Sequence, residues 1–230
     1  MGTQLFLAGD STMAIVESSR YPQMGWGQTL ADYFTDEIIV RNHAASGRST
    51  KSFIDEGRWD EMERAFHPGD YVLIQFGHND QKKDEERATQ PFTSYQHNLH
   101  FFIQCARSAG VIPILLTSIA RRHFNETGHL VETHGDYPQA MKELAVKEEV
   151  LCIDMLSITS DALRNQGDEA SKKWFMRLAA GEYNNYPDGI EDDTHLHELG
   201  ARAHCQLFVQ ALLKINHPLA SYVKRSEVSL

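Results

Sequence analysis

Short apolar runs alternate along the chain with longer segments in which apolar residues recur every three or four positions. The short runs are apolar at nearly every position, which is typical of strands covered on both faces of a sheet. They predict strands at residues 4–8, 38–41, 71–76, 112–116 and 150–153. Because helical patterns separate them, we expect a parallel sheet with right-handed crossovers.

The longer segments predict the helices that connect these strands. In the most regular one, Leu99, Phe102, Ile103 and Ala106 keep a spacing of 3.6 residues, and Gly110 closes the helix. Helices are predicted at residues 26–34, 55–66, 93–109, 137–149, 157–166 and 199–215. Residues 181–194 are rich in Gly, Asn, Asp and Pro, and are expected to form an irregular loop. No repeat or linker divides the chain, so a single domain over residues 1–230 is expected.

Composition narrows the class of protein. The 230 residues include 41% hydrophobic and 23% charged residues, which excludes a disordered chain and a coiled coil. The formal charge of −10 argues against a nucleic-acid partner, because phosphate binding relies on clustered Lys and Arg. No run approaches 18 apolar residues, so no membrane partner is expected. The N-terminal residues lack the basic region and cleavage site of a signal peptide, which predicts a cytoplasmic protein. We expect either a monomer or a homodimer.

Three cysteines, Cys105, Cys152 and Cys205, lie far apart in apolar surroundings. An odd number without paired spacing does not form a disulfide framework. We expect small buried side chains, with a cysteine nucleophile as the alternative.

Polar residues gather where ligands bind in such sheets, beyond the carboxyl ends of the strands. Ser11 follows the first strand, and a base that removes its proton would make it a nucleophile. Asp192 and His195 have the right types at a spacing of three, which on a turn or a first helical turn places both side chains on one face. The three residues therefore predict a Ser-His-Asp triad. His197 and Asp193 are competing candidates for the base and the carboxylate.

An acyl-transfer site also needs hydrogen-bond donors for the developing oxyanion. We expect three of them: the backbone N–H of Ser11 at a strand-to-helix turn, the N–H of Gly47, and the side-chain amide of Asn79. Each residue alone is an ordinary turn or cap residue. Their combination at one edge of the sheet favours the catalytic interpretation.

These motifs resemble the four blocks of the SGNH, or GDSL-type, hydrolase superfamily. The matching blocks are Gly9-Asp10-Ser11, Gly47, Gly77-x-Asn79-Asp80 and Asp192-x-x-His195. The resemblance implies a three-layer α/β/α sandwich with a five-stranded parallel sheet, flavodoxin-like in topology. It also implies Ser11 as nucleophile, Asp192 and His195 as its partners, and Ser11, Gly47 and Asn79 as the oxyanion hole, with no cofactor and no metal.

Further motifs are similar to those of rhamnogalacturonan acetylesterases, which remove acetyl groups from a pectin backbone. They are Gly25-Trp26-Gly27, residues 76–80, and Asp192-x-Thr194-His195 followed by Gly200-Ala201. The resemblance implies an acetylated oligosaccharide as substrate. Arg48, Trp26 and Arg121 are candidate substrate-binding residues, since Arg binds a uronate carboxylate in a bidentate manner and an aromatic ring stacks on sugars.

Other functions stay open at this point. A general acetylxylan or acetyl-sugar esterase, or a lipase-like GDSL esterase, would use the same triad. The blocks Gly9-Asp10, Gly77-His78-Asn79-Asp80 and His195-x-His197 also resemble the ligands of a metal-dependent phosphoesterase, although residues 44–47 offer no carboxylate to bridge two ions. A carbohydrate-binding module on an inactive hydrolase scaffold would not need Ser11 and His195, which are both present.

Overall fold

The computed structural model describes residues 2–228, and its centre is a five-stranded parallel sheet. The strands are β1 (Thr3–Gly9), β2 (Ile38–Asn42), β3 (Tyr71–Gln75), β4 (Ile112–Leu116) and β5 (Leu151–Ile153). Their order across the sheet is β2-β1-β3-β4-β5. The connection from β1 leads to one edge of the sheet, and the strands from β3 onward lie toward the other edge, so the switch point of the topology lies between β1 and β3. Ligands of such sheets bind at this switch point, beyond the carboxyl ends of the strands. The five predicted strands are confirmed.

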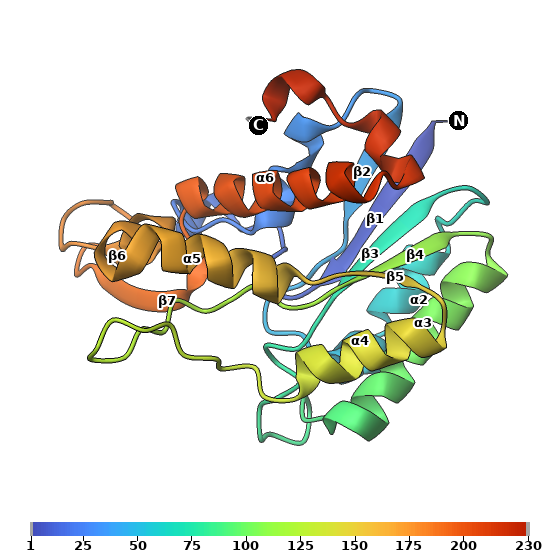
Figure 1. The fold of residues 1–230 in the computed structure, drawn as a ribbon, viewed down its shortest axis with the longest axis horizontal. Coiled ribbons are helices and arrows are strands. Elements are labelled where there is room, and N and C mark those ends of the chain that lie inside the picture. The colour runs from blue at the N-terminus through green and yellow to red at the C-terminus, as the bar shows by residue number, and fades with distance from the viewer. Residues whose placement is uncertain (1, 229–230) are drawn as a thin grey trace.

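Helices cover both faces of the sheet, which confirms the predicted three-layer sandwich (Figure 1). The helices are α1 (Thr50–Asp55), α2 (Arg58–Glu63), α3 (Gln96–Ser108), α4 (Tyr137–Lys147), α5 (Met155–Ser171) and α6 (Glu198–Ile215). Successive residues of β1 point to opposite faces. Leu5 and Leu7 therefore join a core cluster with α5 and α6, whereas Phe6 and Ala8 join a second cluster with α1 to α4.

Two predicted helices are divided in the structure. Residues 26–34 form two short 3-10 helices, η2 (Trp26–Gln28) and η3 (Leu30–Tyr33), instead of one α-helix. Residues 55–66 belong to the end of α1 and to α2, because Gly57 adopts a left-handed conformation (φ = +69°) between them. A left-handed residue ends one helix and redirects the chain.

The other helix predictions are confirmed, with shifted boundaries. A π-helical turn, η4 (Pro91–Tyr95), precedes α3. The carboxylate of Asp154 accepts a hydrogen bond from the N–H of Ser157, so α5 begins earlier than the pattern of apolar residues predicts.

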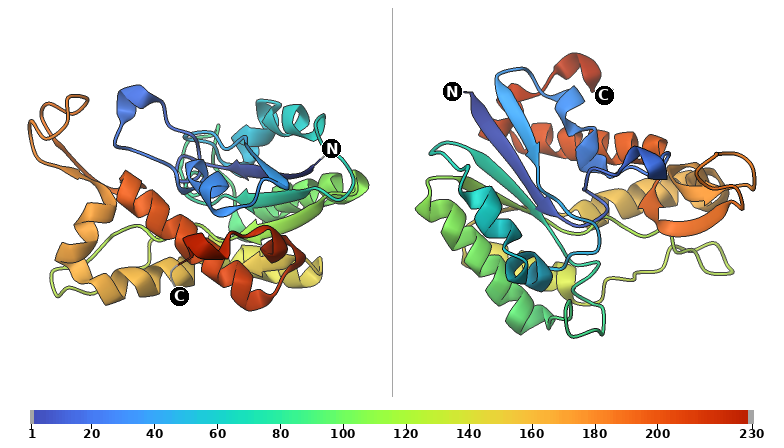
Figure 2. Two further views of the ribbon diagram at one scale, coloured as in Figure 1. Left: turned by 90° about the horizontal axis from the view of Figure 1, so that it is seen from above. Right: turned by 180° about the vertical axis from the view of Figure 1, so that it is seen from behind.

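The expected loop at residues 181–194 is wrong at its C-terminal end. Ile190–Leu196 form strand β7, which pairs antiparallel with β6 (Phe175–Leu178) in a separate two-stranded sheet. Most side chains of β7 are polar, so the strand has no apolar alternation that would reveal it. Figure 2 shows the loop between β6 and β7 extending away from the central sheet.

No helix within residues 2–228 is both long enough and apolar enough to cross a membrane.

Candidate active site

Ser11 lies in a tight turn at the carboxyl end of β1. The carboxylate of Asp10 accepts hydrogen bonds from the backbone N–H and the hydroxyl of Thr12, at 2.9 and 2.8 Å. The carbonyl of Asp10 accepts from the N–H groups of Met13 and Ala14, at 3.1 and 3.0 Å. These bonds fix the backbone on both sides of Ser11, which is only 8% exposed. The hydroxyl is thus held in one place at the switch point of the sheet.

His195 and Asp192 reach this turn from β7. The Ser11 Oγ is 3.1 Å from Nε2 of His195, and Nδ1 of His195 is 2.6 Å from Oδ2 of Asp192. An ionised carboxylate can only accept, so Nδ1 carries the hydrogen and Nε2 accepts from the hydroxyl. The three side chains form one hydrogen-bonded chain in which the imidazole can take the serine proton.

The spacing of Asp192 and His195 works through a bulge and not through a helical turn. Met176 pairs with Asp192 while Phe175 pairs with Leu196, so residues 193–195 bulge out of the β6–β7 ladder. Within the bulge, Oδ1 of Asp192 accepts from the N–H groups of Thr194 and His195, at 2.7 and 3.0 Å. The predicted turn or first helical turn is therefore wrong in form, although the two side chains do meet.

The bonds to Asp192 also set its charge. Partial burial raises the pKa of this carboxyl, but the hydrogen bonds from the ring and the backbone of His195 outweigh burial and lower the pKa to about 2. Asp192 therefore stays ionised and holds the imidazole in one tautomer.

His197, the competing base, occupies a structural position at the start of α6. Its Nδ1 accepts from the N–H of Leu199 at 3.2 Å, and its Nε2 is 3.1 Å from the hydroxyl of Tyr183. Both ring nitrogens are thus bound away from Ser11, and the geometry favours His195 as the base.

Asp193, the competing carboxylate, anchors the hairpin. It accepts from Arg122 Nη1 at 2.7 Å, and from Nε and Nη2 of Arg177 at 2.7 and 2.5 Å. Arg122 also binds Asp168, at the end of α5. The ion pair with Arg122 ties β7 to the body of the molecule, and the pair with Arg177 joins β7 to β6, while the neighbouring Asp192 binds His195.

Two predicted oxyanion donors lie on adjoining loops. The Nδ2 of Asn79, after β3, donates to the carbonyl of Arg48 at 3.0 Å, which brings Asn79 to the loop of Gly47. Gly47 has φ = +80°, and a side chain there would meet nothing within 4 Å. A primary amide carries two hydrogens, so Asn79 can hold the loop and still donate to a ligand.

Trp26 is not available to a substrate, so its prediction as a stacking residue is wrong. It is 0% exposed, its Nε1 donates to Gln75 at 2.9 Å, and its ring packs on Phe208. The large indole fills the core between the sheet and α6, where it buries more apolar area than it could at a sugar site.

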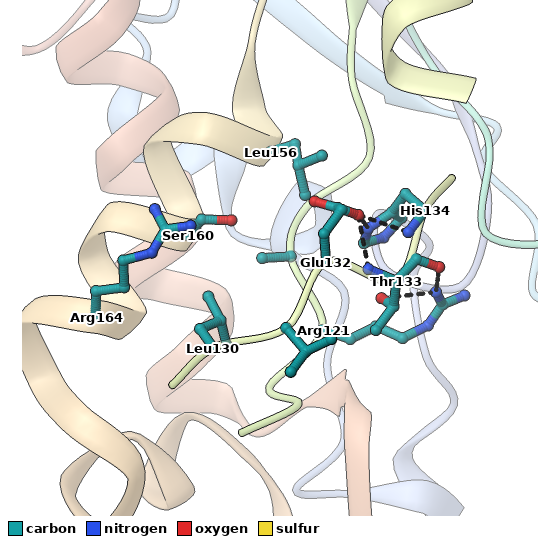
Figure 3. A pocket seen from close by; sticks show the side chains of 10 residues that line it. Arg121, Leu130, Glu132, Thr133, His134, Leu156, Ser160 and Arg164 are labelled. Atoms are coloured by element: carbon teal, nitrogen blue, oxygen red, sulfur yellow. Dashed lines mark hydrogen bonds and ion pairs between the residues drawn. The ribbon is translucent and has the colours of Figure 1, made fainter. Parts of the chain in front are cut away.

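Arg48 and Arg121 differ in what they offer a ligand. Nε of Arg48 binds both carboxylate oxygens of Glu56 at 3.1 and 3.0 Å, and the side chain lines a groove of about 490 Å³ together with Gly47. Arg121 donates to the carbonyl and hydroxyl of Thr133, both at 3.2 Å (Figure 3). It also donates to the carbonyl of His78 at 3.4 Å. Arg48 is thus the more accessible of the two.

The structural role of Asp10 and His78, two buried polar residues of the catalytic blocks, escaped the sequence analysis. Nε2 of His78 binds the carbonyl of Ile119 at 3.0 Å, its ring stacks on His134, and its Nδ1 lies 3.9 Å from Oδ2 of Asp10. Burial, followed by the nearby charges of His134 and Arg121, holds the pKa of His78 well below its usual range. In the sequence, Asp10 and His78 stand inside two of the catalytic blocks, and this placement suggested metal ligation instead of a structural role.

The structure favours neither a cysteine nucleophile nor a metal site within the described residues. Burial raises the pKa of Cys105, Cys152 and Cys205, to about 12 for Cys152, so the reactive thiolate is disfavoured at each. Within residues 2–228, no three His, Cys, Asp or Glu side chains are grouped as metal ligands.

Comparisons with known proteins agree with this architecture. The GDSL-like Lipase/Acylhydrolase family matches residues 7–203. The rhamnogalacturonan acetylesterase RhgT of Bacillus subtilis is 42% identical over 97% of this chain and 95% of its own. The structure is similar to that of B. subtilis YxiM, with a TM-score of 0.82 and 24% identity over 95% of this chain and 58% of that one. It is also similar to Axe2, an acetylxylan esterase of Geobacillus stearothermophilus, with a TM-score of 0.65 and 18% identity over 92% of this chain and 95% of that one.

The chain therefore belongs to the GDSL-like lipase/acylhydrolase family. As a member of this family it is a carboxylic ester hydrolase.

Proposed function

We propose that the protein is a serine esterase that removes O-acetyl groups from carbohydrates, with acetylated rhamnogalacturonan oligosaccharides as substrates. The observation that carries the proposal is the hydrogen-bonded chain from Ser11 through His195 to Asp192. The substrate class is supported by RhgT, because the likeness to that rhamnogalacturonan acetylesterase extends over nearly the full length of both chains.

The reaction follows from these contacts. Ser11 Oγ attacks the acetyl carbonyl while Nε2 of His195 takes its proton. The N–H groups of Ser11 and Gly47 and the amide of Asn79 stabilise the oxyanion. Collapse breaks the bond to the sugar oxygen, which leaves as an alcohol with the proton from His195. Water then attacks the acetyl-enzyme with His195 again as base, and acetate and free Ser11 result.

Arg48 is the candidate for recognition of a uronate. Its guanidinium lies beside Gly47 and can exchange part of its contact with Glu56 for a substrate carboxylate. The same groove contains the carboxylates of Asp55 and Glu86, so we expect a preference for the uronate of about tenfold, near the lower end of what an Arg–carboxylate hydrogen bond contributes. Arg121, engaged by Thr133 and the backbone, should contribute less to this preference.

The test is hydrolysis of matched substrates. Release of acetate is measured from acetylated rhamnogalacturonan oligosaccharides and acetylated xylo-oligosaccharides, and release of p-nitrophenol from p-nitrophenyl butyrate. Wild type, Ser11→Ala, Arg48→Ala and Arg121→Ala are compared. We expect the highest kcat/KM on the uronate-containing substrate, no turnover by Ser11→Ala, and loss of the preference in Arg48→Ala. Equal kcat/KM on the two oligosaccharides would indicate a general acetyl-sugar esterase, and a higher value on the butyrate would indicate a lipase-like esterase.

A further inference from the structure

Asp80 directly follows Asn79, and its side chain is buried in full. Its Oδ1 accepts from the N–H of Thr50 at 3.1 Å, from the hydroxyl of Thr50 at 2.5 Å and from the hydroxyl of Thr89 at 3.1 Å. Its Oδ2 accepts from the Thr50 N–H at 3.2 Å. The carboxylate is thus held by hydroxyl and backbone donors, most of them from one residue of the opposite loop.

Thr50 is the first residue of α1 and lies three positions after Gly47. Asn79 holds the carbonyl of Arg48, and Asp80 holds Thr50, so two consecutive side chains grip the loop at two points just beyond the glycine. Thr50 is fixed further by Asn98, whose Nδ2 donates to the Thr50 hydroxyl at 3.0 Å. Contacts on its C-terminal side therefore help to set the position of Gly47, beside the bond from the N–H of Ala45 to the carbonyl of Gly9 at 2.9 Å on its N-terminal side.

A Cβ built on Gly47 would meet nothing within 4 Å, so no neighbouring atom supports this side of the residue. The hydrogen bonds to Arg48 and Thr50 hold its N–H relative to Asn79, together with the bond from Arg48 Nη1 to the carbonyl of Ser46 at 2.7 Å. On the other side, the Tyr137 hydroxyl lies 2.9 and 2.6 Å from the carbonyl oxygens of Asp80 and Thr89, so its single hydrogen is shared between two points of the segment that carries Asp80.

We infer that Asp80 is a positioning residue for the oxyanion hole, which fixes the Gly47 N–H relative to the Asn79 amide by holding Thr50. This inference rests on the proposed esterase mechanism. An oxyanion donor acts at full strength only within hydrogen-bond distance of the developing charge. Loss of Asp80 should therefore lower kcat through Gly47, while the acetyl ester in the ground state binds as before.

The pKa of Asp80 is consistent with a side chain that can lose its charge. Burial raises it to about 7, against the opposing effect of the hydrogen bonds from Thr50 and Thr89. A neutral substitute should therefore be compatible with folding. In Asp80→Asn, the amide oxygen can take the place of Oδ1, which receives three of the four bonds.

The experiment measures kcat and KM on p-nitrophenyl acetate, and the inhibition constant of a small boronic acid. A boronate bound to Ser11 places a tetrahedral anion in the oxyanion hole. We expect Asp80→Ala to lower kcat by about 10- to 100-fold, less than the loss of a donor itself, with KM changed by less than about twofold. Boronate affinity should fall in parallel, and Asp80→Asn should recover most of the lost rate.

Thr50→Val and Thr89→Val form a matched pair. Each removes one hydroxyl that donates to Asp80, but only Thr50 adjoins the Gly47 loop. We expect Thr50→Val to lower kcat several-fold and Thr89→Val to leave it close to that of wild type. Because both replacements retain the size of threonine, they test the inference even if Asp80→Ala does not fold.

A double-mutant cycle completes the test. If Asp80 acts through the oxyanion hole, its loss costs less kcat in Asn79→Ala than in wild type, because half of the geometry that it maintains has been removed. Any of three results would overturn the inference. These are an unchanged kcat in folded Asp80→Ala, equal effects of Thr50→Val and Thr89→Val on kcat, and fully additive losses of kcat in the double variant. Ser11→Ala is measured beside them: a fully active Ser11→Ala would overturn the esterase mechanism instead.

Discussion

Ser11 and Asn79 lie at the carboxyl ends of β1 and β3, within the five-stranded sheet, whereas Asp192 and His195 lie on the β6–β7 hairpin beside it. The exposed fractions are 8% and 7% for the first pair, against 26% and 27% for the side chains of the second. The proposed nucleophile and one proposed oxyanion donor are thus held by buried hydrogen bonds of the loops that follow β1 and β3. The proposed base is held by a bulge and by the ion pairs of Asp193, one of which involves the buried Arg122.

This difference separates two demands of the chemistry. The oxyanion donors must keep their geometry while charge develops, and a buried, hydrogen-bonded loop provides that. The imidazole must receive a proton and release it to the leaving group, for which a partly exposed strand is suitable. The largest effects should come from groups at the contact of the two regions, and smaller ones from their supports.

The largest expected effect is at the base. His195→Ala should lower kcat by about a million-fold, as for loss of a triad histidine, because Ser11 then has no proton acceptor. His197→Ala is the matched control, since its ring binds Leu199 and Tyr183 and should matter for stability more than for kcat. Steady-state kinetics decide the assignment, and an inactive His197→Ala with an active His195→Ala would reverse it.

Next comes the carboxylate of the hairpin. Asp192→Ala should lower kcat by about ten-thousand-fold, because the imidazole loses the partner that fixes its tautomer. Asp193→Ala should lower kcat by about tenfold at most, since its carboxylate holds Arg122 and Arg177 and acts on His195 only through the position of β7. The same assay on both variants checks this, and comparable losses would remove the distinction between the two aspartates.

On the sheet side, Asn79→Ala should lower kcat by about 100- to 1000-fold, the usual loss for one oxyanion donor. KM should change much less, because the amide acts on the transition state. Initial rates over a range of substrate concentrations separate the two constants. An increase in KM at constant kcat would place Asn79 in substrate binding.

These two regions also differ in how far the sequence revealed them. The apolar runs of β1 to β5 and the spacing of Leu99, Phe102, Ile103 and Ala106 predict the sheet and α3, because burial on both faces leaves an unmistakable pattern. The hairpin left no such pattern, since Asp192, Asp193, Thr194 and His195 occupy positions where a strand would show apolar residues.

The candidate site was predictable where chemistry restricts residue type. Ser11, Gly47, Asn79, Asp192 and His195 stand in short blocks whose combination is specific. Residues that act through packing or through another residue were not predictable, because they contact residues that are distant in the sequence and near only in the folded chain. Trp26 was assigned to the substrate although it fills the core, and the hold of Asp80 on Thr50 spans 30 positions of the chain.

The smallest effect on activity is expected at His204, which lies where the hairpin packs against α6. His204 on α6 packs against Phe175, the first residue of β6, and burial lowers its pKa from 6.5 to about 4. The unfolded chain binds this proton between pH 6.5 and 4 and the folded protein does not, so the free energy of unfolding falls as the pH decreases through this interval.

His204→Leu removes this contribution. The loss of unfolding free energy between pH 7 and pH 4 should become smaller by about 3 kcal/mol, with kcat at pH 7 changed little. Urea denaturation of wild type and variant over this range measures the difference. Identical pH profiles would show that the pKa of His204 does not differ between the folded and unfolded states, which would contradict the prediction.

The most direct test of the account is covalent labelling of the nucleophile by a p-nitrophenyl phosphonate ester, followed by peptide mass spectrometry. The account predicts one adduct per chain, on Ser11. Labelling should be slowed by orders of magnitude in His195→Ala, because the sheet nucleophile depends on the hairpin base. An adduct on another residue, or equally fast labelling of His195→Ala, would contradict the claim that the two regions together form the catalytic site.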